Sequence, residues 1–302
     1  MISKLQFMKY KLQNVWLTFI IDDQFDNKTI DDLFKYFHLS KKSIHLLKQN
    51  KEYFLNNQFV TSNTCLHKKD QFKIRAFDDS GIDFIPQPKD IHIIYEDDFL
   101  LIINKDAGMN VHPDQKEGID TLCNYVAYYY QQHHLNLPVR YLHRLDFDTS
   151  GLIMFCKCAL IQPLLDDSLA HKLIKRSYLA LVKGNIPTSK TQTIQTYIAK
   201  DRHHSNKMRV AEHGQKAITH YRLIKNYKNK ALVECTLDTG RTHQIRVHLA
   251  SIGHAIIGDP LYGTPSDKIK RQFLHAYRLE FTHPVTNESI QLECPLPKDI
   301  SL

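Results

Sequence analysis

Helical and strand-like hydrophobic patterns alternate over the N-terminal part of the chain. Asp32 follows Thr29 at the spacing of a capping box, which marks the start of a helix. Apolar side chains then recur at helical spacing, at Ile30, Leu33, Phe34 and Phe37. A second helix is expected after Ser40. Residues 53–60 predict a β-hairpin, and residues 72–75 predict a further strand.

The pattern becomes strand-rich beyond a linker at residues 81–89, which contains two prolines. Apolar runs predict strands at residues 91–95, 100–104, 152–156, 179–182, 219–224, 231–237 and 289–294. Helices are expected at residues 121–131, 162–171 and 242–252. We therefore expect a small α+β domain over residues 1–88. An α+β domain with a mostly antiparallel mixed sheet is expected over residues 89–302.

The charge of the chain bears on its partner. The formal net charge is +8 and the pI is about 9.0. Residues 171–216 contain ten lysines and arginines but only two acidic residues, Asp201 and Glu212. A surface that contacts phosphates needs such a concentration of positive charge. A polyanion is therefore the expected partner, and a basic protein without a particular partner is the alternative from charge alone.

The cysteines and the apolar runs bear on location. The six cysteines are scattered and form no CxxC pair, a pattern typical of free thiols in a reducing compartment. The N-terminus has no basic segment followed by a long apolar one, and no run reaches 18 apolar residues. We therefore expect a cytoplasmic protein with no membrane partner, and by default a monomer.

One polar, turn-rich run lies between apolar segments of the larger domain. It reads Arg-Tyr-Leu-His-Arg-Leu-Asp-Phe-Asp-Thr-Ser-Gly-Leu over residues 140–152. Its last polar residues favour tight turns directly before a predicted strand. Asp146 would then lie on a stiff loop at the edge of a sheet, where functional residues often lie.

This run is similar to the motif around the catalytic aspartate of RluA-type pseudouridine synthases. Three further segments agree with that family in the same order, at residues 96–113, 175–184 and 240–263. The resemblance covers most of residues 90–302, and Asp106 replaces the proline that is usual in the family. It implies a pseudouridine synthase, an enzyme that isomerises uridine to pseudouridine in RNA.

The resemblance assigns the catalytic roles to Asp146, Tyr178 and Arg246. Breaking the glycosidic bond leaves C1′ electron-deficient, and the Asp146 carboxylate can attack that carbon, stabilise it or take the 2′ proton. The guanidinium fork of Arg246 is expected to keep this carboxylate charged and to hold both of its oxygens. Tyr178 is expected to stack on the uracil, with its hydroxyl near the C5 proton. The reaction oxidises nothing, so we expect no cofactor, and we expect no metal.

The same resemblance suggests which residues contact RNA. Arg144 would insert where the target base leaves the stack, or would only contact a phosphate. The remaining candidates are His143, Lys207, Arg209, Lys216 and Arg241. Lys207 and Arg209 belong to a polar hairpin region over residues 202–215, which Lys216 directly follows, and this region would clamp the RNA backbone. A basic loop that is simply solvated is the alternative for that region.

Other functions fit the sequence less well. A glycoside hydrolase needs two carboxylates at a defined separation, which Asp146 and Asp148 would reach only by accident. The histidines lack the spacing of a zinc site. A catalytically silent RNA-binding or ribosome-assembly factor would not need the full catalytic set. Large-subunit ribosomal RNA is the expected substrate because the family mostly modifies it, with transfer RNA as the alternative.

The N-terminal domain has a resemblance of its own. Its helix–helix–hairpin order resembles the S4 RNA-binding module in a degenerate form. The second predicted helix carries only Lys41, Lys42 and Lys48 as basic residues. The domain is therefore expected to bind RNA weakly or to serve a structural role.

Overall fold

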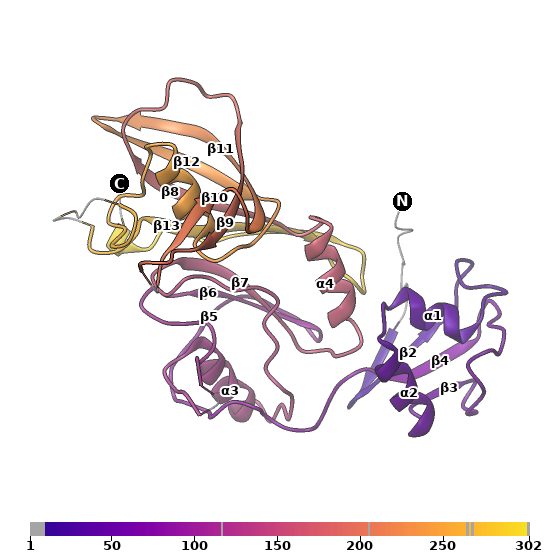
Figure 1. Cartoon of the computed structure of the whole chain (residues 1–302). Helices are drawn as coiled ribbons and strands as arrows, with labels where there is room; N and C mark the ends of the chain where they lie inside the picture. Colours follow the sequence, from indigo (N-terminus) through magenta and orange to yellow (C-terminus); the bar gives the residue numbers. More distant parts are fainter. Residues whose placement is uncertain (1–9, 116, 205, 264–265, 267–268, 301–302) are drawn as a thin grey trace.

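The computed structural model describes residues 10–300, apart from 116, 205, 264–265 and 267–268. Figure 1 shows two bodies within these residues. The N-terminal unit, residues 10–75, is a small sheet with two helices, and the large unit, residues 92–300, is built on a much larger sheet. No helix in the described part of the chain is long and apolar enough to cross a membrane.

The N-terminal unit has an antiparallel sheet of order β1-β2-β4-β3. Its elements are β1 (Tyr10–Gln13), β2 (Trp16–Ile20), α1 (Ile30–Tyr36), α2 (Lys41–Gln49), β3 (Tyr53–Leu55) and β4 (Gln71–Arg75). The predicted capping box begins α1, since Asp32 N donates to Thr29 Oγ1 and the Asp32 carboxylate accepts from Thr29 N. Aromatic rings fill the core, at Phe19, Phe34, Phe37, Tyr53 and Phe72.

The sheet of the large unit follows the order β10-β9-β11-β12-β8-β13-β7-β6-β5, with β14 paired to β13. The strands are β5 (His92–Glu96), β6 (Leu100–Lys105), β7 (Ser150–Cys156), β8 (Lys175–Lys183), β9 (Gln192–Lys200), β10 (Met208–Ala211), β11 (Gln215–Tyr227), β12 (Lys230–Leu237), β13 (Leu274–Thr282) and β14 (Ser289–Glu293). The helices are α3 (Leu122–Gln132), α4 (Gln162–Ala170), α5 (Gln244–Ser251) and the 3-10 turn η1 (Lys298–Ile300). Among the described strands only β13 and β7 run parallel. The large unit is therefore α+β with a mostly antiparallel mixed sheet, as predicted.

The chain enters β7 directly from the turn-rich run of residues 140–149. Every residue of β7 is buried, which explains its nearly continuous apolar sequence. Gly151 has a φ of 115°, and a Cβ there would lie 2.3 Å from the backbone oxygen of Ala276 on β13. Only glycine lets the two strands approach so closely, which fixes where the run ends.

Some predicted elements differ from the observed ones. The predicted hairpin over residues 53–60 is wrong in its second arm: after β3 there is only an isolated bridge between Leu55 and Gln58, and β3 pairs with β4. The sequence patterns also did not predict β1, β2, β9, β10 or β13. β13 lies in the middle of the sheet and is buried over its first half, so it lacks the alternation of a half-exposed strand.

The two units are joined through aromatic and backbone contacts. The ring of Tyr10 lies 5.2 Å from that of Phe99, and the ring of Phe77 lies 6.1 Å from it. The backbone oxygen of Ala76 accepts a hydrogen bond from Leu160 N at 2.9 Å. One continuous apolar core therefore extends through both units.

Candidate active site

A cavity of about 1280 Å³ opens on the large unit. The turn-rich run forms one wall, and β8 and the connection from β12 into α5 form the others. Asp146, Tyr178 and Arg246 all line it, although they are far apart in the sequence. The structure therefore brings the three predicted catalytic residues to one place.

A buried lysine holds the backbone of the loop that carries Asp146. Lys105, at the end of β6, is 1% exposed and its Nζ donates to the backbone oxygens of Asp106, Met109 and Phe147. Burial lowers the pKa of Lys105 to about 7, and the nearby charge of Asp146 opposes this shift. The loop backbone at the residue after Asp146 is thereby fixed.

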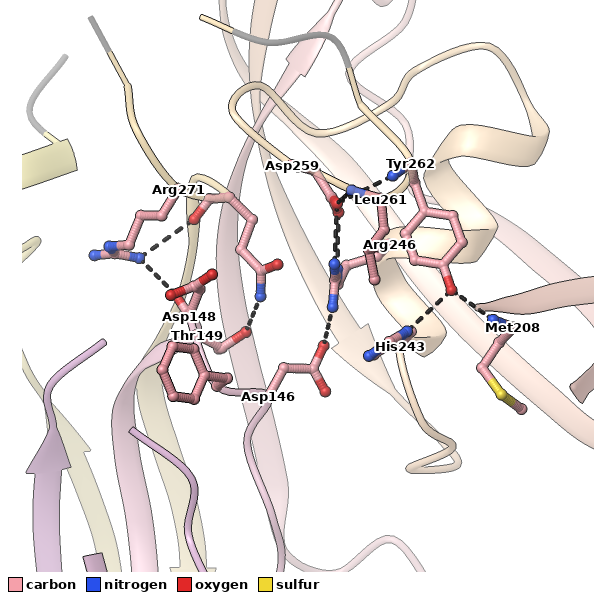
Figure 2. A network of polar contacts seen from close by, with 12 residues as sticks. Asp146, Asp148, Thr149, Met208, His243, Arg246, Asp259, Leu261, Tyr262 and Arg271 are labelled. Atoms are coloured by element: carbon pink, nitrogen blue, oxygen red, sulfur yellow. Dashed lines mark hydrogen bonds and ion pairs between the residues drawn. The ribbon is translucent and has the colours of Figure 1, made fainter. Parts of the chain in front are cut away.

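Arg271 and Gln272, which precede β13, hold the other end of the same loop, and Figure 2 shows Arg271 beside Asp148. Arg271 donates to the backbone oxygen of Asp148 at 2.8 Å and also pairs with Asp299 near the end of the described chain. Gln272 donates to Thr149 Oγ1 at 2.8 Å. The sequence thus predicted a stiff loop correctly, but these contacts come from segments that carried no motif.

Three charged side chains, Asp146, Arg246 and Asp259, are linked by hydrogen bonds in the cavity wall. In Figure 2, Arg246 lies between Asp259 and Asp146. Its Nη1 donates to Asp146 Oδ2 at 3.0 Å. Its Nε and Nη2 donate to the two oxygens of Asp259 at 2.7 and 2.9 Å. The prediction that the fork holds both oxygens of Asp146 is therefore wrong, because the fork binds Asp259 and only the outer nitrogen reaches Asp146.

Asp259 anchors this arrangement. Its side chain is fully buried and also accepts from the backbone N of Leu261 and of Tyr262, at 2.9 and 3.1 Å. Burial alone would raise the pKa of Asp259, but the hydrogen bonds and charge of Arg246 outweigh it and lower that pKa. The ring of Tyr262 lies 5.2 Å from the guanidinium carbon of Arg246. Arg246 is thus fixed on its far side, and its position determines that of the Asp146 carboxylate.

Asp146 keeps one oxygen available. Its side chain is 24% exposed, whereas that of Arg246 is 5% exposed. Arg246 binds Oδ2, and no described residue donates a hydrogen bond to Oδ1. One oxygen is therefore held in a fixed orientation while the other faces the cavity, which suits a carboxylate that must act on a bound molecule.

Tyr178 lies on β8 and is 4% exposed. Burial raises the pKa of its hydroxyl above the ordinary value, and the charge of Arg176 opposes this. The phenol therefore stays protonated at neutral pH, and its ring forms part of the cavity wall.

The residues predicted to contact RNA divide into two groups. Arg144, His143 and Arg241 line the cavity, and Arg144 and Arg241 are exposed. Arg144 Nη1 lies 3.4 Å from His112 Nε2. His143 is 7% exposed, and burial together with the charge of Arg176 lowers its pKa to about 3, so its ring is neutral.

The second group lies outside the cavity lining. Lys207, Arg209 and Lys216 do not contribute to it. Arg209 is on β10 and Lys216 on β11, both exposed, while Lys207 Nζ lies 5.9 Å from the ring centre of Tyr262. The region predicted as one hairpin is the connection from β9 to β10 together with β10 and the turn into β11.

Several structural partners of the site were missed by sequence reasoning. Asp259 and Tyr262 belong to the Gly-Asp-Pro-Leu-Tyr-Gly segment, which was noted only as part of a resemblance. The acidic residue in this segment could have indicated a partner for the active-site arginine. Lys105 also lay in a segment that matched the family, but no sequence signal pointed to Arg271. Within the described residues no group of three histidine, cysteine or acidic side chains could hold a metal ion.

Comparison with known proteins agrees with this geometry. The family model for RNA pseudouridylate synthase matches residues 99–251, and that for the RluD ribosomal pseudouridine synthase N-terminal domain matches residues 17–72. The "Uncharacterized RNA pseudouridine synthase YhcT" of Bacillus subtilis is 41% identical, over 86% of this chain and 87% of that protein. The "Ribosomal large subunit pseudouridine synthase D" of Neisseria meningitidis is 38% identical, over 74% of this chain and 62% of that protein.

A solved structure agrees as well. The human RNA pseudouridylate synthase domain containing 1 protein has a TM-score of 0.56 and 26% identity, over 69% of this chain and 86% of that one. The family model covers half of the chain, and it includes the loop of Asp146, β8 and all of α5. The chain therefore belongs to the RNA pseudouridylate synthase family and is an enzyme that isomerises uridine to pseudouridine in RNA.

Proposed function

We propose that this enzyme modifies uridines of large-subunit ribosomal RNA and that Asp146 is its catalytic carboxylate. The substrate is supported by relatives named for the large ribosomal subunit, at 38% and 40% identity. The catalytic role is supported by one observation above the others. Asp146 presents a free carboxylate oxygen to the cavity while Arg246 holds the other.

Asp146 acts at the ribose of the target nucleotide. When the bond between C1′ and uracil N1 breaks, positive charge develops on the sugar, and an ionised carboxylate close to it lowers the barrier. Arg246 orients the Asp146 carboxylate by a direct hydrogen bond, and Asp259 prevents the guanidinium from turning away. The ring of Tyr178 stacks on the uracil, and its hydroxyl lies near the C5 proton that leaves after the base is reattached.

The RNA approaches the cavity across its basic rim. Arg144 and Arg241 are exposed there, and Arg144 fills the space that the target base leaves in the RNA. Lys207, Arg209 and Lys216 contact the RNA backbone farther from the cavity. His143 contacts the target nucleotide from within the wall.

The proposal also covers the domains, the oligomeric state and the location of the protein. Residues 1–88 form an S4-like accessory domain and residues 89–302 the catalytic domain. The protein acts as a monomer, and a ribosomal RNA substrate places it in the cytoplasm.

The test uses purified protein and three classes of RNA: large-subunit ribosomal RNA, small-subunit ribosomal RNA and transfer RNA. Pseudouridine is located after the reaction by carbodiimide labelling and primer extension. We expect new pseudouridine in the large-subunit RNA only, and none with Asp146→Asn. Modification of transfer RNA alone would overturn the substrate. Equal modification by wild type and Asp146→Asn would overturn the catalytic role.

A further inference from the structure

A buried arginine in the cavity wall lacks a partner. Five basic side chains of the described residues are at most 8% exposed: Lys105, Lys157, Arg176, Arg246 and Arg271. Lys105 donates to backbone oxygens, and Lys157, Arg246 and Arg271 each pair with a carboxylate. The side chain of Arg176 makes no hydrogen bond or ion pair with any described residue. The guanidinium therefore has no carboxylate partner in the described protein, and an anion brought into the cavity could supply one.

Arg176 is directed into the active-site cavity. It lies two residues before Tyr178 on β8, so both side chains project from the same face of the strand, and both line the cavity. Its Nε has no hydrogen-bond partner and is shielded from solvent. A Cβ on Gly240 would lie 3.2 Å from its Nη1, so the glycine leaves room for the guanidinium under the loop that enters α5.

A second unpartnered side chain lies next to it. Both ring nitrogens of His143 are buried and make no hydrogen bond of good geometry with a described residue, although the backbone of Arg144 lies close enough to act on the ring. His143 and Arg176 are close enough that the charge of the arginine acts on the histidine ring. A neutral imidazole offers one N–H donor, and a guanidinium offers five, so this corner of the cavity is rich in unused donors.

The corner lies beside the exposed arginines of the rim. Arg144 follows His143 directly in the sequence. Arg241 follows Gly240, which lies next to the guanidinium of Arg176. The anions that an RNA substrate supplies are its phosphates. A phosphate that enters between these two loops meets a planar fork whose geometry suits two phosphate oxygens.

We infer that Arg176 and His143 form a subsite for one phosphate of the RNA chain beside the flipped uridine. The phosphate supplies the missing counter-charge of Arg176 and positions the target nucleotide against Tyr178. This inference rests on the assignment of the cavity as the active site. Arg176 is then a positioning residue, and its loss should weaken RNA binding more than it slows the chemical step.

The test combines a protein variant with a modified RNA. Arg176→Met keeps the length of the side chain but removes its charge, and Lys228→Met makes the same charge change at an exposed turn between β11 and β12. The RNA is a large-subunit hairpin that the wild-type protein modifies. Each phosphate near its target uridine is replaced in turn by a neutral methylphosphonate.

We expect Arg176→Met to weaken RNA binding by about 10- to 100-fold, the effect of a charged hydrogen-bonded contact. The single-turnover rate at saturating RNA should fall by a smaller factor than the affinity, because Arg176 positions the nucleotide but does not act on the reacting atoms. Arg176→Lys should recover part of the affinity, since it restores charge without the fork. One methylphosphonate should weaken binding by the wild type and by Lys228→Met but not by Arg176→Met.

The melting temperature distinguishes a role of Arg176 in RNA binding from a role in holding the fold together. Because the buried charge has no partner, Arg176→Met should melt at the same temperature as the wild type or higher. A lower melting temperature, or unchanged RNA affinity, would contradict the inference. So would methylphosphonates that weaken the wild type and Arg176→Met equally at every position. Failure of the proposed function would differ, since the wild type would then make no pseudouridine in the hairpin.

Discussion

The two units of the molecule treat charge differently. In the N-terminal unit the only buried polar side chain among the described residues is Ser62, and charged residues pair at the surface, as Lys48 does with Asp31. The large unit instead buries Arg246, on α5, with Asp259, in the connection that follows α5. Burying charge costs free energy, so a protein retains it where a precise arrangement is required. The contrast indicates that the large unit gives up stability for an ordered site and that the N-terminal unit does not.

The largest expected effect comes from Asp146→Asn. The change keeps the size of the side chain but removes the charge that faces the ribose. We expect the turnover rate to fall by at least about 10³-fold, as for loss of a group that acts directly on the reacting atoms. Single-turnover assays with the same RNA measure it. RNA affinity within a few-fold of the wild type would show that the loss lies in the chemistry.

Arg246→Lys should be the next largest. A lysine has one ammonium group and cannot bind Asp259 with a fork while it also donates to Asp146. We expect a loss of about 10²- to 10³-fold in the turnover rate, because the carboxylate loses both orientation and charge compensation. Arg222→Lys, at a half-exposed arginine on β11, is the control. Near-wild-type turnover of Arg246→Lys would remove the arginine from the mechanism.

The pH dependence of stability should reflect the large unit. Burial lowers the pKa of His248 and of His275 to about 4, against about 6.5 in the unfolded chain. Between these values the unfolded state binds more protons than the folded state, so stability falls as the pH falls from about 6.5 to 4. Thermal unfolding from pH 7 to pH 4.5 measures this.

A variant without one of these histidines sharpens the same test. His275 Nδ1 lies 2.9 Å from Ser150 Oγ, beside the start of β7. His275→Gln cannot titrate, so its melting temperature should fall less steeply over this pH range than that of the wild type. An identical slope for the two proteins would exclude His275 as a source of acid sensitivity.

The smallest effect is expected in the N-terminal unit. Lys41→Ala combined with Lys42→Ala removes two exposed charges from the start of α2. If these lysines bind phosphates, their removal should slightly reduce the salt dependence of RNA binding and change the affinity by only a few-fold. The turnover rate at saturating RNA should not change. A fall in turnover comparable to that of Arg246→Lys would contradict the division of roles between the two units.

The sequence predicted the residues of the site better than the contacts between them. Asp146, Tyr178 and Arg246 lay in recognisable segments, and local turn residues predicted the stiff loop. Nothing in the local pattern could show that Arg246 directs its fork at Asp259, because that pairing depends on how the connection after α5 folds back. The partnerless state of Arg176 was equally invisible, since it depends on every surrounding side chain.

The fold shows the same limit. Helices α3, α4 and α5 were predicted from the sequence close to their observed bounds, and the capping box at Thr29 predicted the start of α1. β13 escaped prediction because His275 interrupts its buried half and its register shifts between Ala276 and Arg278, so it shows neither a continuous apolar run nor a regular alternation. Local patterns located the strands with continuous apolar runs, such as β6 and β7, but missed the half-exposed strands β1, β2, β9 and β10.

The most direct test of the central claim is a transcriptome-wide pseudouridine map from cells that lack this gene. Carbodiimide labelling and primer extension would be compared after complementation with the wild type and with Asp146→Asn. The account predicts that one or a few sites in large-subunit ribosomal RNA lose pseudouridine and that only the wild type restores them. Restoration by Asp146→Asn, or lost sites confined to another class of RNA, would contradict it.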